Sequence, residues 1–274
     1  MLVIKIGGGA AIGETAYANF AADLAELNEP AVVVHGGNAE FSRLSAALGM
    51  PPRMIASASG RVTRYTDRAT MDAMLMAYCG KVNKRLVAAL QAAGVNAVGL
   101  SALDGAIATG RRKAVLRGTE DGKPKVLRDD HAGTIEQLDP RLVRLLLDAG
   151  YLPVLTPPAL SHDGEPINVD GDKLALALAE ALQADGLLFF SDTPGLLADR
   201  DDEASLIREI DASVPGAALA AASGRMTVKV EAALGAVGRG VGRVVFADAR
   251  VEHPIRRALG GAGTVVRASA LPAP

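Results

Sequence analysis

Residues 2–9 read LVIKIGGG and residues 31–37 read AVVVHGG, two apolar runs that each end in glycines. Each run is followed by a segment with helical periodicity, the first from about Glu14 to Leu27 and the second after Gly37. Continuous Val, Ile and Leu runs between helices are typical of a parallel sheet that is covered on both faces. Two strand–glycine–helix units within about forty residues therefore predict a doubly wound α/β fold.

The rest of the chain continues this pattern, with two interruptions. Apolar runs predict further buried strands at 96–100, 153–156, 187–191 and 243–247, and helical periodicity predicts a long helix from about Asp67 to Ala93. An alternating, charged segment at 105–137, with Asp121-Gly122 at its middle, predicts a β-hairpin that stands off the sheet. Residues 158–170 predict a second, shorter hairpin, and residues 270–274 a loose tail.

Composition and charge exclude several classes of function. The chain has 274 residues and a net charge of −2, with no Trp and 3% aromatic residues, so neither a basic field nor a stacking surface indicates nucleic-acid binding. One cysteine and four histidines are too few for a zinc cage, and we expect no protein-held metal centre. No signal peptide and no membrane-spanning apolar stretch is evident. We therefore expect a cytoplasmic enzyme or binding protein without a membrane or nucleic-acid partner.

The two glycine turns are candidate phosphate-binding elements. Ligands of parallel α/β sheets lie at the carboxyl ends of the strands, where Lys5 precedes Gly7 and Gly8, and where Gly36 and Gly37 follow the next strand. Glycines let backbone N–H groups approach a phosphate, and the helix that follows adds positive potential. Neither the Rossmann nor the Walker glycine pattern is present. Tight turns and helix–strand packing remain the alternative explanation for these glycines.

Two polar segments are candidate substrate-binding elements. Arg64 precedes the long helix and could grip a carboxylate with two hydrogen bonds, or it could be a solvated arginine that pairs with Asp67. Asn168 could hold a substrate. Asp170 and Asp172 could cap the helix that follows, whereas Asp172 could instead position lysines or a hydrated Mg²⁺.

Taken in order along the chain, seven segments resemble the amino acid kinase family, most closely its acetylglutamate kinase branch. The resemblance extends from Lys5 to about Asp248. The segments are Lys5-Ile6-Gly7-Gly8, Val34-His35-Gly36-Gly37, Arg64-Tyr65-Thr66, Gly80-Lys81-Val82-Asn83-Lys84, Ile167-Asn168-Val169-Asp170-Gly171-Asp172, Ser191-Asp192-Thr193-Pro194-Gly195 and Met226-Thr227-Val228-Lys229.

The resemblance implies a fold and a reaction. Enzymes of this family transfer the γ-phosphoryl group of ATP, with Mg²⁺, to a side-chain carboxylate and form an acyl phosphate. The implied fold is a three-layer αβα sandwich with a central, mainly parallel sheet, formed by the single domain 1–274. Its N-terminal lobe, 1–157, would take the amino-acid substrate and form a homodimer, and its C-terminal lobe, 158–274, would take the nucleotide.

The resemblance also implies roles for individual residues. Lys5 and Lys229 would flank the transferred phosphoryl group, and Asp172 would organise both lysines. Gly36, Gly37, Arg64 and Asn168 would bind the amino-acid substrate, whereas Gly7, Gly8, Asp192, Gly195 and Met226 would bind phosphate or nucleotide, with Gly8 and Gly37 donating N–H groups. Taken alone, the segments around Asp192 and Met226 could be simple turns.

The predicted hairpin is unusually basic, and its charge indicates which branch of the family the chain resembles. Within 111–128 only Glu120 and Asp121 oppose seven cations. A small acetylated amino acid needs no such surface. Together with Tyr65, which stands where acetylglutamate kinases usually have valine, these charges resemble the [amino-group carrier protein]-L-2-aminoadipate 6-kinases of lysine biosynthesis. There a small acidic carrier protein blocks the substrate amino group, and it would bind the seven cations: Arg111, Arg112, Lys113, Arg117, Lys123, Lys125 and Arg128.

Other interpretations stay open at this point. The basic segment could be a solvated hairpin with incidental charge. The enzyme could be an acetylglutamate kinase of arginine biosynthesis, or serve both pathways. A ligand-binding regulator of the same fold is a further alternative, although it would have no need to keep Lys5, Lys229 and Asp172. Because residue 2 already begins a strand, we expect no room for the N-terminal helix that links dimers of arginine-inhibited acetylglutamate kinases into hexamers.

Overall fold

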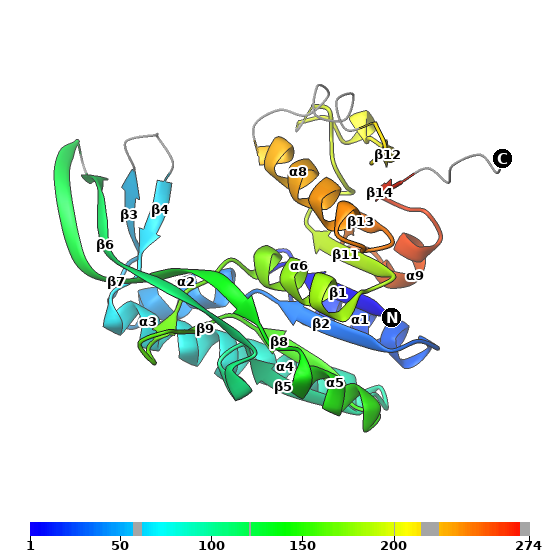
Figure 1. Ribbon diagram of the computed structural model, residues 1–274, viewed down its shortest axis with the longest axis horizontal. Helices are drawn as coiled ribbons and strands as arrows, with labels where there is room; N and C mark the ends of the chain where they lie inside the picture. The colour runs from blue at the N-terminus through cyan, green and yellow to red at the C-terminus, as the bar shows by residue number, and fades with distance from the viewer. Residues whose placement is uncertain (57–61, 121, 200, 215–224, 269–274) are drawn as a thin grey trace.

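An eight-stranded sheet forms the centre of the computed structural model, which describes residues 1–274 except 57–61, 121, 200, 215–224 and 269–274 (Figure 1). The strand order is β12-β14-β13-β11-β1-β2-β8-β5. All neighbours are parallel except β13 and β14, which confirms the predicted, mainly parallel sheet. The strands are β1 (Leu2–Ile6), β2 (Ala31–His35), β5 (Ala97–Ser101), β8 (Leu152–Thr156), β11 (Gly186–Ser191), β12 (Glu209–Asp211), β13 (Val244–Asp248) and β14 (Thr264–Arg267).

Helices cover both faces of this sheet and make the predicted three-layer sandwich. Successive side chains of β1 point to opposite faces, so Leu2, Ile4 and Ile6 share one core with the first set of helices while Val3 lies in the other core. The first set is α1 (Glu14–Ala25), α4 (Asn83–Ala92) and α9 (Pro254–Leu259), and the second is α5 (Arg141–Asp148), α6 (Gly171–Leu182) and α8 (Arg225–Gly238).

The predicted long helix exists, but its middle is wound differently. It consists of α3 (Arg68–Leu75), a π-helical segment (Met76–Val82) and α4. The Asp67 side chain caps α3 by accepting a hydrogen bond from the Thr70 backbone N–H at 2.9 Å. Helix α2 (Asn38–Ala47) follows the second glycine turn and packs Phe41 against α3 and the π-helical segment. Wider π turns often occur at functional sites.

A second sheet stands off the central one (Figure 1). Both predicted hairpins belong to it and are confirmed, the long one as β6–β7 and the short one as β9–β10. A third hairpin, β3–β4, was not predicted. Gly122 has a φ of 75° at the tip of the long hairpin, whereas Asp121 and the predicted tail lie outside the described residues. The strands are β3 (Arg53–Ala56), β4 (Val62–Tyr65), β6 (Ala108–Glu120), β7 (Lys123–Leu138), β9 (Ala159–Ser161) and β10 (Pro166–Ile167).

Two short 3-10 turns, Asp104–Ala106 and Glu203–Ser205, complete the described elements. Within the described ranges, no helix has the length and apolar character needed to span a bilayer.

Candidate active site

The two glycine turns lie directly against each other. Strands β1 and β2 are parallel neighbours, so both turns leave the same edge of the sheet. The Ala39 backbone N–H donates to the Gly8 carbonyl at 2.8 Å. A Cβ atom added at Gly8 would lie 2.4 Å from the Gly37 nitrogen, so the packing is backbone on backbone and only glycine fits. The structure thus brings the turns together, while their contact with phosphate stays a prediction.

An ion pair joins Lys5 to the start of α6. The nearly buried Lys5 ammonium lies 2.6 Å from the Asp172 carboxylate. The capping role falls to Asp170, whose carboxylate accepts from the backbone N–H groups of Asp172 and Lys173 at 2.8 and 3.1 Å. The two acidic residues therefore have different functions. Asp172 is available to hold a lysine, as the functional interpretation predicted.

A cavity of about 180 Å³ lies beside this ion pair. Lys229 lines it from α8, and its ammonium is 5.9 Å from the centroid of the Phe246 ring, a cation–π distance. Phe246 stacks on Phe189 with ring centroids 5.3 Å apart. The cavity therefore combines an aromatic wall with cations and carboxylates. Its lining residues are Asp170, Asp172, Lys173, Leu176, Phe189, Val228, Lys229, Ala232 and Phe246.

Arg64 lies half-buried on β4 with spare hydrogen-bond donors. Its guanidinium is 4.5 Å from the centroid of the Phe41 ring and donates to the Asn38 side chain at 3.1 Å. Among the residues that the structure describes, Asn38 rather than Asp67 is thus its polar contact. The buried Nε has no hydrogen-bond partner among the described residues. Burial lowers the pKa of this guanidinium, which nevertheless stays charged. A charged group with an unused, desolvated donor suits an anionic ligand such as a carboxylate.

Tyr78 is a candidate site residue that sequence reasoning missed, because its spacing placed it in the apolar stripe of the long helix. Its ring occupies the space that a Cβ on Gly37 would need, with Cδ2 only 2.8 Å from that position. Burial raises the pKa of the Tyr78 hydroxyl, although Arg64 and the Gly37 backbone N–H lower it. A neutral phenol therefore borders both the second glycine turn and Arg64. Helical periodicity holds no signal for a polar role of this kind.

His35 supports the glycine turn rather than acting as an acid or base. Its Nδ1 lies 2.9 Å from the Gly36 carbonyl, which can only accept, and its Nε2 faces the Asn83 amide nitrogen at 3.1 Å. Complete burial and, to a smaller extent, the nearby Lys5 charge lower the pKa of His35 to about 4. The imidazole is thus neutral at physiological pH. Because both ring nitrogens contact partners inside the protein, His35 is not placed to act as a general base.

The remaining predicted residues lie around this centre. Asn168 follows β10, held by backbone hydrogen bonds on both sides. Asp192 is exposed after β11, and its carboxylate is 4.0 Å from where a Cβ on Gly9 would lie. Gly195 is buried, and an added Cβ would lie 2.7 Å from Thr264 Oγ1, so packing alone requires glycine there. Met226 lies in the first turn of α8 with its side chain outside the described set. Neither Asp192 nor Gly195 is among the described residues that line the cavity.

The seven cations of the long hairpin fall into different environments. Arg112 pairs with Asp129 at the base of the hairpin, and Arg111 pairs with Glu136 at 3.2 Å. Nearer the tip, the register sets Arg117 opposite Val126 and Arg128 opposite Val115, so these four side chains share one face. Lys113, Lys123 and Lys125 are also exposed. The face with Arg117 and Arg128 thus combines positive charge with exposed valines, whereas Arg111 and Arg112 are engaged within the chain.

Known proteins with similar sequences include two kinds of kinase. A [LysW]-aminoadipate kinase from Thermus thermophilus is 53% identical over 269 residues, which are 97% of this chain and 100% of that protein. An acetylglutamate kinase from Leptospira biflexa is 37% identical over 258 residues, covering 93% of this chain and 86% of that one.

Similar folds occur among solved structures. N-acetylglutamate synthase from Neisseria gonorrhoeae, complexed with coenzyme A and N-acetyl-glutamate, has a TM-score of 0.76 and 27% identity, covering 98% of this chain and 60% of that chain. The pattern of the amino acid kinase family matches residues 1–248, which include both glycine turns, the Lys5–Asp172 pair and Lys229. On its fold, its site and this match, the chain belongs to the amino acid kinase family.

Proposed function

We propose that this enzyme transfers the γ-phosphoryl group of ATP to the side-chain carboxylate of L-2-aminoadipate whose amino group is linked to a carrier protein. The product is an acyl phosphate for lysine biosynthesis. The observation that carries the proposal is the Lys5–Asp172 pair, which lies between two interlocked glycine turns and a cavity that Lys229 lines. The 53% identical relative with the name [LysW]-aminoadipate kinase supports the choice of acceptor.

The chemistry needs charge neutralisation rather than a base. The attacking carboxylate is already ionised at neutral pH. The barrier lies in bringing this anion to an anionic phosphate, so positioning and electrostatic stabilisation dominate. Lys5 and Lys229 supply the positive charge, and the backbone N–H groups of Gly8 and Gly37 supply fixed dipoles. Asp172 keeps the Lys5 ammonium pointed at the reacting group.

The C-terminal part of the site suits MgATP. Lys173 and Lys229 line the cavity with Asp170 and Asp172, so both phosphate oxygens and the water shell of a Mg²⁺ ion find complementary partners there. Bound Mg²⁺ would neutralise charge on the phosphates. We assign the nucleotide to residues 158–274, with Gly7, Asp192, Gly195 and Met226 around it, and the amino-acid substrate and a homodimer contact to residues 1–157.

The acceptor side has two components. Arg64 and Asn168 bind the amino-acid end of the substrate beside Gly36 and Gly37, and the unused Arg64 donor is the main support for this role. The basic hairpin attracts the acidic carrier. Electrostatic complementarity of this kind raises the association rate and specificity more than the affinity.

A second candidate is an acetylglutamate kinase of arginine biosynthesis. The 37% identical acetylglutamate kinase favours it, since the same Arg64 grip suits a small N-blocked amino acid. A small acetylated substrate, however, leaves the exposed cations of the hairpin without a binding partner.

The hairpin decides between these candidates experimentally. Reversing Arg117 and Arg128 to Glu should lower kcat/KM for carrier-linked aminoadipate about tenfold at low ionic strength and remove much of its salt dependence. Turnover of a small N-blocked aminoadipate should stay near wild type. The matched control reverses Arg85 and Arg257, which are exposed on α4 and α9. Equal loss in both double variants, or no loss with subsaturating carrier, contradicts carrier binding by the hairpin.

A further inference from the structure

The base of the long hairpin lies between Arg64 and Asn168, the two residues proposed to bind the phosphoryl acceptor, which is the amino-acid substrate. The pairing of β6 with β7 shifts here, since Arg112 is opposite Gly133 while Ala114 is opposite Asp130. Two residues, His131 and Ala132, therefore face a single residue of β6. Such β-bulges redirect the backbone and are common beside active sites.

The redirected backbone of His131 forms hydrogen bonds with the segments that contain Arg64 and Asn168 instead of with β6. Its N–H donates to the carbonyl of Thr66, two residues after Arg64, at 2.6 Å. Its carbonyl accepts from the Asn168 N–H at 2.8 Å. The Gly133 N–H adds a bond to the Asn168 carbonyl at 2.9 Å. One residue thus spans the gap between the two segments.

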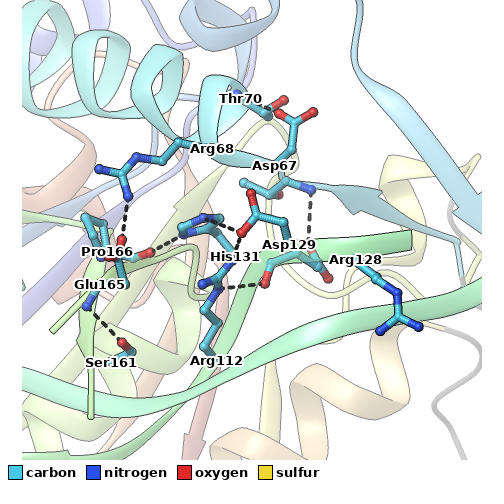
Figure 2. Close-up of polar contacts among 12 residues, drawn as sticks. Asp67, Arg68, Thr70, Arg112, Arg128, Asp129, His131, Ser161, Glu165 and Pro166 are labelled. Atoms are coloured by element: carbon cyan, nitrogen blue, oxygen red, sulfur yellow. Dashed lines mark hydrogen bonds and ion pairs between the residues drawn. The ribbon is translucent and has the colours of Figure 1, made fainter. Parts of the chain in front are cut away.

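The His131 side chain locks this bridge in place. The ring is buried, with 1% of the residue exposed, and its Nδ1 is 2.9 Å from the Pro166 carbonyl (Figure 2). Because a carbonyl can only accept, Nδ1 carries the hydrogen. The other nitrogen, Nε2, faces the Asp129 carboxylate at 3.6 Å. The ring therefore ties β7 to the residue that begins β10, two positions before Asn168.

Asp129 and its partners lie on the other side of the ring. Asp129 has a φ of 64°, in the left-handed region that aspartate tolerates better than most residues. Its carboxylate pairs with Arg112 and accepts from the Arg68 backbone N–H at the start of α3, and the Arg112 contact holds its pKa below the usual range. The Arg68 side chain in turn pairs with Glu165 (Figure 2). The cluster joins four elements, β6, β7, α3 and the β9–β10 turn.

We propose that His131 is a positioning residue for the acceptor, which sets the separation of Arg64 and Asn168 through its bonds to Thr66, Asn168 and Pro166. The proposal rests on the acceptor role of Arg64 and Asn168 in the proposed function. Its effect should therefore appear in acceptor binding and leave the nucleotide side unchanged, since the cavity lined by Lys229 shares no residue with this cluster.

Kinetics of His131→Leu and His131→Asn provide the first test. Leucine keeps the bulk and removes the ring donor to the Pro166 carbonyl, so Asn168 should lose its fixed position. The KM for carrier-linked aminoadipate should then rise about tenfold, which equals about 1.4 kcal/mol of binding free energy. The KM for ATP should change less than about twofold. Asparagine can place an N–H near the position of Nδ1 and should restore most of the acceptor KM. The control is His162→Leu, since His162 is exposed and contacts Glu136 instead.

Hydrogen exchange provides a second test that needs no acceptor. In His131→Leu, the amides of Gly133 and Asn168 should exchange faster than in wild type and in His162→Leu. His131→Phe replaces the leucine variant if the latter does not fold. Unchanged exchange at these amides, or equal rises in the KM for acceptor and for ATP, overturns the proposal. A wild-type enzyme that phosphorylates no carboxylate would instead refute the proposed function, and the exchange data would still decide on His131.

Discussion

Gly8→Ala tests the interlocking of the two glycine turns. The new Cβ would lie 2.4, 2.6 and 2.8 Å from the backbone atoms Gly37 N, Gly36 C and Asn38 N, whereas ordinary contacts begin at 3.4 Å. All three obstacles are main chain, which cannot rotate away. The turns must therefore separate by about 1 Å, a misplacement that costs on the order of 10²-fold in rate when it disturbs the alignment of reacting groups.

Gly13→Ala is the matched control from the same loop. An added Cβ there has no heavy atom within 4 Å, and the residue has a φ of −119°, which alanine adopts freely. The measurement is kcat by acceptor-dependent release of ADP, with thermal unfolding in parallel. We expect about a 10²-fold loss of kcat in Gly8→Ala and near wild-type activity in Gly13→Ala. A Gly8→Ala enzyme within about threefold of wild type would refute the reasoning that backbone alignment of the turns drives catalysis.

Four further changes, three substitutions and one change of pH, probe other parts of the site. Lys5→Ala and Lys229→Ala should each lower kcat by on the order of 10²–10³, and a variant that keeps the wild-type kcat would remove its lysine from the phosphoryl group. Arg64→Lys should raise the acceptor KM while keeping the charge, because lysine lacks the two-pronged guanidinium; an unchanged KM would place Arg64 outside the site. The pKa of His35 is about 4 in the folded protein and 6.5 in the unfolded chain. Because the unfolded chain therefore binds a proton more readily as pH falls, the free energy of unfolding should drop by on the order of 3 kcal/mol between pH 6.5 and 4. NMR should find the His35 ring neutral at pH 5.5, and a titration midpoint near 6.5 would contradict this.

Local patterns were sufficient to predict the layers of the fold. The runs at 2–6 and 31–35 became adjacent parallel strands, and the hairpins at 105–137 and 158–170 formed where charge alternation and turn residues indicated. The β3–β4 hairpin, with four residues in each strand, was not predicted. The π-helical turn also leaves no trace in hydrophobic spacing.

The charged residues of the site could be predicted from the sequence, whereas the residues that position them could not. Lys5 and Asp172 are 167 residues apart, and only the resemblance to a known family joined them before the structure did. The choice between Asp170 and Asp172 as helix cap depends on the path of the chain, which no local pattern fixes. His131 bonds through its backbone to Thr66 and Asn168 and through its ring to Pro166, all far away in the sequence, so no local pattern indicates that role.

Formation of an acyl phosphate, trapped with hydroxylamine, tests the central claim most directly. Carrier-linked aminoadipate, N-acetyl-aminoadipate and N-acetylglutamate would be compared as acceptors at equal, subsaturating concentrations with MgATP. The account predicts hydroxamate from carrier-linked aminoadipate at a rate well above that from either acetylated amino acid. Efficient turnover of N-acetylglutamate with none of the carrier-linked substrate would contradict it and assign the enzyme to arginine biosynthesis.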